Sequence, residues 1–156
     1  MRVLFVCTGN TCRSPMAEAV FRHKLREAGL GGVLQADSAG TANRRTGEPP
    51  DPRAQQTLRK HGIDFTGLRS RPLKESDFAE FDLLLAMDQG HYAQLAAMAP
   101  DGMAEKIHMF LEPVEPGGPA EVPDPYYGDL DDYEAAFGLI GPACDAWVAK
   151  LEPMTR

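Results

Sequence analysis

Residues 7–15, CTGNTCRSP, mark a switch from a strand to a helix, and the expected fold is built around this switch. Residues 2–6 form a short β-branched and aromatic run, which is typical of a buried strand. Ser14 is a good N-cap, Pro15 fits the first helical position, and Gly29 ends the helix that follows. The stretch is therefore predicted to be a loop that joins the first strand to the first helix.

The same alternation of strand and helix signals continues along the chain. An Asp-Pro pair at residues 51–52 repeats this helix start, and Pro142 is expected to kink or split the closing helix. Such alternation implies a three-layer α/β fold, with a four-stranded, doubly wound parallel sheet and helices on both faces. Further strands are predicted at residues 33–38, 82–87 and 107–110, and helices at residues 51–61, 75–80, 89–98 and 131–151.

Composition limits the class of protein and the compartment. We expect residues 1–156 to form a single domain, since this length can bury a full core. The net charge of −7 argues against nucleic acid or an anionic membrane as partner, and the sequence has no apolar run long enough to span a membrane. Three cysteines without an export signal indicate reduced thiols in a cytoplasm. Four histidines without ligand spacing indicate that there is no metal site.

The loop at residues 7–15 has the residue types that nucleophilic chemistry on a phosphate needs. Backbone N–H groups at a strand-to-helix turn attract anions, and together with Arg13 they favour the thiolate form of Cys7. Arg13 can bind two phosphate oxygens in parallel, which lysine cannot do. Gly9 lets the backbone approach the ligand, Asn10 tolerates a left-handed conformation, and Ser14 can donate a hydrogen bond to the sulfur. A lone cysteine at a strand end is usually an ordinary buried residue, but this combination favours a catalytic loop.

The C-x5-R-S-P pattern of this loop resembles the phosphate-binding loop of low-molecular-weight protein-tyrosine phosphatases. The second motif, DPYYGD at residues 124–129, is similar to the acid loop of that family. Shorter matches at residues 37–40, 47–50, 60–63 and 86–88 extend the resemblance over essentially the whole chain. The resemblance implies a phosphotyrosine phosphatase I-like fold and hydrolysis of phosphotyrosine in proteins. It also implies that Cys7 forms a thiophosphoryl-enzyme and that Asp124 acts as general acid and then as general base.

Further site residues follow from the resemblance. No cofactor or metal is expected, because loop amides and Arg13 neutralise the phosphate oxygens. Tyr126 and Tyr127 are expected to form the walls of a slot for an aromatic ring, and Ser38 is expected to support the loop through Asn10. The resemblance also implies a reversible Cys7–Cys12 disulfide that protects the thiolate. The predicted substrate-binding residues are Thr8, Gly9, Asn10, Thr11, Cys12, Ser14, Arg44, Tyr126 and Tyr127.

The resemblance implies a phosphotyrosine-containing protein, such as a tyrosine kinase, as partner, and we expect a monomer. Three departures from the family pattern leave the specificity open. Arg44 stands where the family often has an aromatic residue, so it either favours acidic flanks or is simply solvated. The family frequently has a histidine near Leu68, and this chain has none there. Thr11 resembles the protein-arginine-phosphatase branch, whereas Tyr126 and Tyr127 favour phosphotyrosine.

Two further alternatives have less support. Thioredoxin-coupled arsenate reductase needs a further pair of cysteines near the middle of the chain, and residues 60–100 contain none. A redox or phosphate-binding module without turnover has no use for a general acid such as Asp124. Asp88 is expected to be a helix N-cap or a support for the loop, and Cys144 is expected to be a small core residue.

Overall fold

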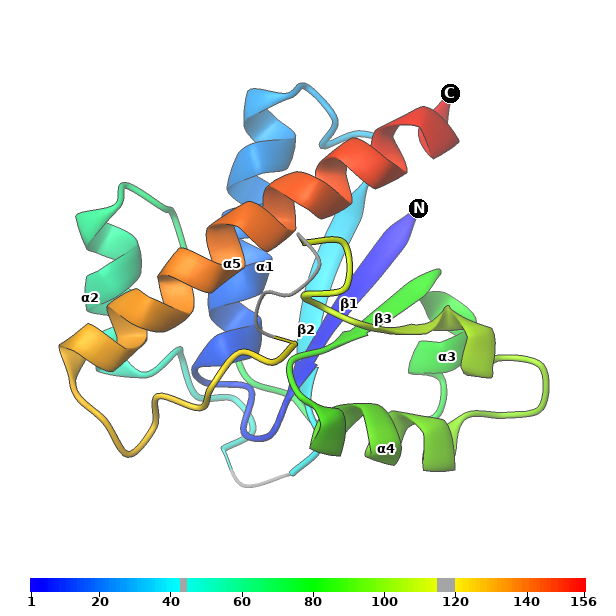
Figure 1. The fold of residues 1–156 in the computed structure, drawn as a ribbon, viewed down its shortest axis with the longest axis horizontal. Coiled ribbons are helices and arrows are strands. Elements are labelled where there is room, and N and C mark those ends of the chain that lie inside the picture. The colour runs from blue at the N-terminus through cyan, green and yellow to red at the C-terminus, as the bar shows by residue number, and fades with distance from the viewer. Residues whose placement is uncertain (43–44, 115–119) are drawn as a thin grey trace.

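A four-stranded parallel sheet in the order β2-β1-β3-β4 runs through the middle of the computed structural model (Figure 1). The structure describes residues 1–42, 45–114 and 120–156. The predicted α/β fold with a four-stranded parallel sheet is confirmed. Its strands are β1 (Arg2–Cys7), β2 (Gln35–Gly40), β3 (Leu83–Ala86) and β4 (Ile107–Met109).

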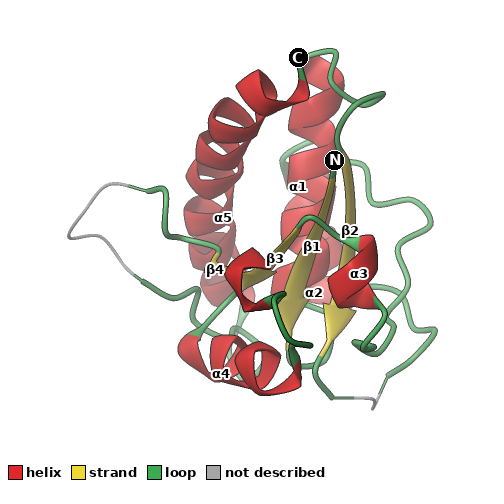
Figure 2. Cartoon of the chain, turned by 90° about the vertical axis from the view of Figure 1, so that its right-hand side faces the viewer, coloured by secondary structure: helices red, strands yellow, loops and turns green. Residues whose placement is uncertain are grey.

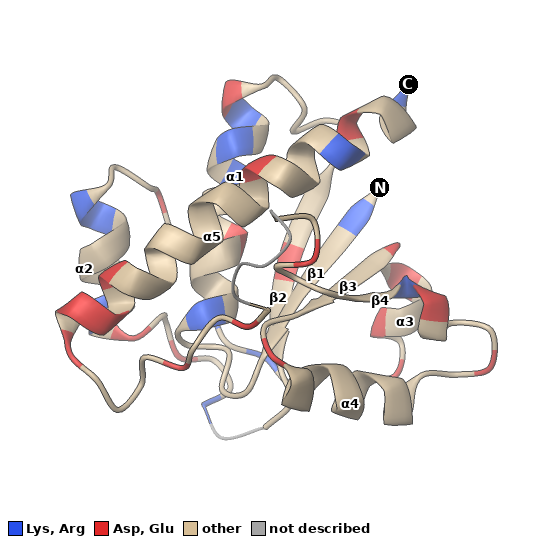
Figure 3. Cartoon of the chain, viewed as in Figure 1, with Lys and Arg blue, Asp and Glu red and all other residues tan. Residues whose placement is uncertain are grey.

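Helices cover both faces of the sheet, as Figures 1 and 2 show from two sides. One face is covered by α1, α2 and α5, and the other by α3 and α4. Asp129 caps α5, and the carboxylates of its first turn lie at the positive end of the helix dipole (Figure 3). The helices are α1 (Arg13–Glu27), α2 (Pro52–Lys60), α3 (Asp77–Glu80), α4 (Gln89–Met98) and α5 (Leu130–Leu151), with short 3₁₀ turns at Ala104–Lys106 and Glu152–Thr155.

The central strand β1 supplies side chains to two separate cores. Val3, Phe5 and Cys7 join the core under α1 and α5, whereas Leu4 and Val6 join the core on the other face. Because both faces are buried, the strand is an almost continuous apolar run rather than an alternating one. The strand therefore ends with Cys7 on the side of α1, where the loop to that helix begins.

Several element boundaries differ from the prediction. The second strand was expected at residues 33–38 but occupies Gln35–Gly40. A turn in which Leu34 N–H donates to Leu30 O takes up the earlier residues, and the strand continues until Gly40 pairs with Cys7. The predicted bounds of α4 are confirmed.

The predicted N-cap of the first helix is wrong, and the predicted split of the closing helix does not occur. The first helix starts at Arg13, so Ser14 lies inside it and its hydroxyl binds other side chains instead of capping the helix. Pro142 does not split α5, which runs without a break from residue 130 to residue 151. Buried residues on both sides of the proline, including Ile140 and Cys144, pack into the same core. No helix in the described ranges is long and apolar enough to cross a membrane.

Candidate active site

The loop between β1 and α1 surrounds the Cys7 thiol. Cys7 is buried, and its Sγ lies 2.8 Å from Ser14 Oγ. Asn10, in the middle of the loop, has a left-handed backbone with φ of 54°. Asn tolerates this conformation better than most residues, because its short polar side chain can bind locally. The loop therefore curls around the sulfur as its sequence predicted.

A hydrogen-bond network around Asn10 fixes the direction of the bond to Cys7. Asn10 Nδ2 donates to Ser14 Oγ and to Ser38 Oγ, each at 2.9 Å, and Asn10 Oδ1 accepts from Arg71 N at 2.9 Å. An amide nitrogen only donates, so Ser14 Oγ is the acceptor in its bond from Asn10. The Ser14 hydroxyl hydrogen is thus free to point at Cys7 Sγ.

Glu18 extends this network from the loop into the protein interior. Ser38 Oγ donates to Glu18 Oε1 at 2.6 Å, and the other Glu18 oxygen pairs with Arg22. The Glu18 side chain is only 3% exposed, and burial raises its pKa to about 7. The sequence prediction missed Glu18. The sequence did contain one sign that Glu18 is buried, because it lies three residues before Phe21 and so on the apolar face of the first helix.

Arg13 closes the other end of the loop. Its Nη1 donates to Asp88 Oδ2 and to Val122 O, both at 2.9 Å, and its Nη2 lies 3.6 Å from Asp124 Oδ2. Asp88 also accepts from His91 N and so caps α4, as expected. The Arg13 side chain is 4% exposed, so its guanidinium is held where it can face a bound anion.

His91 is a second contact that the sequence prediction missed. Its Nε2 lies 2.8 Å from Thr8 Oγ1 in the loop, and burial lowers the pKa of the ring. The imidazole therefore packs under the loop in its neutral form. Its position three residues after the Asp88 cap was the only hint in the sequence.

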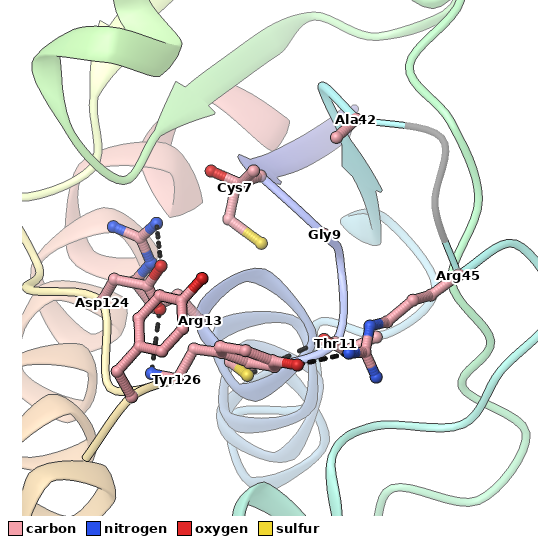
Figure 4. A pocket seen from close by; sticks show the side chains of 11 residues that line it. Cys7, Gly9, Thr11, Arg13, Ala42, Arg45, Asp124 and Tyr126 are labelled. Atoms are coloured by element: carbon pink, nitrogen blue, oxygen red, sulfur yellow. Dashed lines mark hydrogen bonds and ion pairs between the residues drawn. The ribbon is translucent and has the colours of Figure 1, made fainter.

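Asp124 and the two tyrosines lie across the mouth of the loop. Asp124 Oδ1 accepts from Tyr126 N at 3.1 Å, and its side chain is 43% exposed. The rings of Tyr126 and Tyr127 meet edge to face, with centroids 4.9 Å apart. In Figure 4 the Cys7 side chain points into the space that Asp124 and Tyr126 border on one side and Arg45 on another.

These groups enclose a pocket of about 170 Å³. Asn10, Ser14 and Ser38 support the loop from behind, although Asn10 and Ser14 were predicted to bind substrate. Arg44 lies outside the described residues. No group of metal-binding side chains occurs among the residues that the structure describes. The lining consists of nine predicted residues (Cys7, Thr8, Gly9, Thr11, Cys12, Arg13, Asp124, Tyr126 and Tyr127) together with Ala42 and Arg45.

The end of β2 presses closely against the loop. Gly40 pairs with Cys7, and the next two residues continue the contact, because Thr41 N donates to Cys7 O and Ala42 N donates to Thr8 O. A Cβ atom at position 40 would lie 2.6 Å from Thr8 O. Only glycine fits there without moving one of the two backbones.

A doubly wound α/β sheet with cysteine and arginine at the two ends of one strand-to-helix loop is the arrangement expected of a cysteine-dependent phosphatase. Within that class, the chain belongs to the low molecular weight phosphotyrosine protein phosphatase family, whose family model matches residues 2–155.

Individual relatives match over nearly the whole chain. A low molecular weight protein-tyrosine-phosphatase of Streptomyces coelicolor is 42% identical over 153 residues, which cover 96% of this chain and 93% of the relative. The crystal structure of YfkJ from Bacillus subtilis has a TM-score of 0.94 at 40% identity, over 100% of this chain and 97% of that one. A structure of the YwlE arginine phosphatase, a Bacillus subtilis protein, has a TM-score of 0.87 at 31% identity, and the match covers 97% of this chain and 96% of that one.

Proposed function

We propose that this chain hydrolyses phosphotyrosine in proteins through a covalent intermediate on Cys7. The observation that carries the proposal is the Cys7 thiol at the base of a pocket, with the Ser14 hydroxyl 2.8 Å from its sulfur. A sulfur that receives a hydrogen bond is stabilised as thiolate, both as attacking group and as leaving group. Arg13 and Asp124 line the same pocket and would supply the other two functions that the reaction needs.

In the first step, the Cys7 thiolate attacks phosphorus and the bond from phosphorus to the phenol oxygen breaks. Asp124, in its acid form, gives its proton to that oxygen, so a neutral phenol leaves. Arg13 and the loop amides bind the equatorial phosphate oxygens while charge develops on them. The product of this step is a phosphorylated Cys7 with Asp124 as carboxylate.

In the second step, water attacks phosphorus and Asp124 takes up its proton. The bond between sulfur and phosphorus breaks, inorganic phosphate forms, and Cys7 returns to thiolate. The Ser14 hydroxyl stabilises the leaving sulfur, because Asn10 already occupies the Ser14 oxygen as an acceptor. Each residue ends the cycle in the state in which it began.

The substrate preference rests on the shape of the pocket. Tyr126 and Tyr127 line its wall, and aromatic walls hold a flat ring by edge or offset contacts. A phosphorylated phenol would set its ring against this wall with its phosphorus at Cys7, whereas phosphoserine is shorter and has no ring. A phosphotyrosine-containing protein such as a tyrosine kinase is the proposed partner, and a monomer is the proposed state.

Replacement of Asp124 tests the mechanism. Asp124→Asn should lower kcat/KM about 10²- to 10⁴-fold for aryl phosphates with poor leaving groups, and less for strongly acidic phenols that need no proton. Cys7→Ser should lose nearly all turnover, and Asp101→Asn, in an exposed turn, should behave as wild type. If Asp124→Asn lowered kcat/KM equally for good and poor leaving groups, Asp124 would not be the general acid.

Phosphoarginine hydrolysis is the second candidate, and Thr11 in the pocket lining is the observation that favours it. The similarity to the YwlE structure gives it further support. Peptides with phosphotyrosine, phosphoserine or phosphoarginine separate the candidates when they are compared with wild type and with Thr11→Ile. We expect phosphotyrosine to exceed phosphoserine at least about a hundredfold in kcat/KM, with phosphoarginine below phosphotyrosine. If phosphoarginine were instead the better substrate of wild type, and Thr11→Ile reversed that order, the second candidate would replace the first.

A further inference from the structure

Arg53, in the first turn of α2, binds two separate parts of the site at once. Its Nε and Nη2 donate to the two carboxylate oxygens of Asp51, each at 3.0 Å. Its Nη1 donates to the carbonyl oxygen of Gly128 at 2.8 Å. The planar guanidinium therefore joins the start of α2 to the end of the turn that follows Asp124.

One side of this contact is anchored to the phosphate-binding loop. Asp51 N donates to Thr11 O at 2.8 Å, so the partner of Arg53 is itself tied to that loop. Arg53 also lies over the ring of Tyr133, 4.8 Å from its centroid, and the Tyr133 hydroxyl lies 3.1 Å from Cys12 Sγ. The guanidinium thus has a fixed position relative to the loop.

The other side of the contact is the acid loop, residues 124–128. Arg53 lies 5.7 Å from the centroid of the Tyr126 ring, and Tyr126 N donates to Asp124 Oδ1. The loop closes in a turn in which Gly128 N donates to Pro125 O, and Arg53 binds the carbonyl of that same glycine. Arg53 therefore contacts the acid loop at two points that follow Asp124.

We propose that Arg53 is a positioning residue that holds Asp124 at the correct place over the phosphate-binding loop. This inference rests on the proposed function. Of the described residues that line the pocket, Arg13 and Arg45 are the arginines, so Arg53 acts through the acid loop and not on the substrate. Asp51 neutralises its charge, which leaves geometry as its contribution. A lysine can bind Asp51 or Gly128 but cannot reproduce the planar fork that binds both.

Leaving-group dependence tests this role, because it reports on proton donation by Asp124. Arg53→Met and Arg53→Lys should each lower kcat/KM for phenols of high pKa by up to about 100-fold, since a small misplacement of a catalytic group is that costly. Both variants should remain close to wild type with strongly acidic phenols. The control is Arg59→Met on the same helix, where Arg59 stacks on Phe65 at 5.3 Å, and it should match wild type throughout.

A double-mutant cycle separates positioning from other effects. Once Asp124→Asn has removed the acid, Arg53→Met should cause little further loss. A full additional loss in the Asp124→Asn background, or an equal loss for every leaving group in Arg53→Lys, would overturn the inference. If wild type itself had no phosphatase turnover, the proposed function would fail instead, so the two failures are distinct.

Discussion

Cys7 and Cys12 share one loop but are chemically different thiols. Cys7 Sγ has the Ser14 hydroxyl beside it, whereas Cys12 Sγ lies against the Tyr133 hydroxyl at 3.1 Å. Burial raises the pKa of Cys12, so this residue stays a neutral thiol near pH 7. Cys144 is fully buried in α5, and burial raises its pKa as well. An oxidant should therefore attack Cys7 first and leave Cys12 as the thiol that can respond.

Mild peroxide should inactivate the protein reversibly. Peroxide oxidises Cys7 to a sulfenic acid, and the Cys12 thiol then attacks that sulfur and expels water, which forms a disulfide. Dithiothreitol should restore activity in wild type and in the control Cys144→Ser, but much less in Cys12→Ser. Activity recovery and mass spectrometry of the linked peptides are the measurements. Equal recovery of Cys12→Ser and wild type would rule out protection by Cys12.

For single residues, the sequence was enough to predict those that lie in a recognisable motif. It was not enough for residues whose role depends on contacts with distant parts of the chain. Cys7, Arg13 and Asp124 lie in motifs, and the structure brings all three to one pocket. Glu18 and Arg53 are single charged residues in helical stretches, where a solvated position is the normal expectation. Their partners Ser38 and Gly128 are far away in sequence, so only the tertiary fold shows what they bind.

Among the elements, the contact between α1 and β2 contains a buried carboxyl group. Glu18 of α1 accepts a hydrogen bond from Ser38 of β2 and pairs with Arg22, which also donates to Ala36 O in the same strand. Burial raises the pKa of Glu18 from 4.5 to about 7. The folded protein thus binds this proton more tightly than the unfolded chain does. The stabilisation from this proton is complete below pH 4.5 and is lost as the pH rises through about 7.

Glu18→Gln should remove this pH dependence, because the amide does not ionise. The Tm of the variant minus that of wild type should increase between about pH 5 and about pH 8. Glu75→Gln, at an exposed position before α3, is the control and should show a constant difference. Thermal unfolding followed by circular dichroism at both pH values gives the answer. A difference for Glu18→Gln that does not change with pH would show that the group does not titrate in this range.

Element order was predictable from sequence, because each strand-to-helix change has its own local signal. The Asp51 cap shows this well, since its side chain accepts from Arg53 N at the predicted start of α2. The errors arose where tertiary contacts override local preference. Ser14 has the chemistry of a cap, but Cys7 and Asn10 occupy its hydroxyl, and packing around Pro142 keeps α5 continuous.

On the scale of the whole molecule, the candidate phosphate-binding loop follows an inner strand of the sheet and not an edge strand. The loop connects the central strand β1 to α1, and Arg13 ties it to Asp88 before α4 and to Val122. An anion bound there contacts groups from several parts of the chain. Because the protein has a net charge of −7, weak binding of anions elsewhere on the surface should be small.

Inorganic phosphate should therefore stabilise the whole protein against heat. At about 100 times the Kd, binding to the folded state alone contributes about 2.7 kcal/mol. For a chain of this size that free energy corresponds to a rise in Tm of roughly 5–10 °C. Arg13→Ala should abolish the shift, and Arg69→Ala, with an exposed side chain, should retain it. Thermal unfolding over a series of phosphate concentrations measures the effect, and an equal shift in Arg13→Ala would place the binding elsewhere.

The tight contact at Gly40 limits which substitutions this position can accept during evolution. Gly40 contributes no side chain, yet any Cβ atom there would meet the carbonyl of Thr8, which is a backbone group that cannot rotate away. A substitution must shift the loop that surrounds Cys7, so its effect should fall on turnover as well as on folding. In a saturation library selected for activity, position 40 should be as intolerant as Cys7 and Arg13. Selection for activity should therefore keep glycine at position 40, although this residue has no side chain that could take part in the reaction.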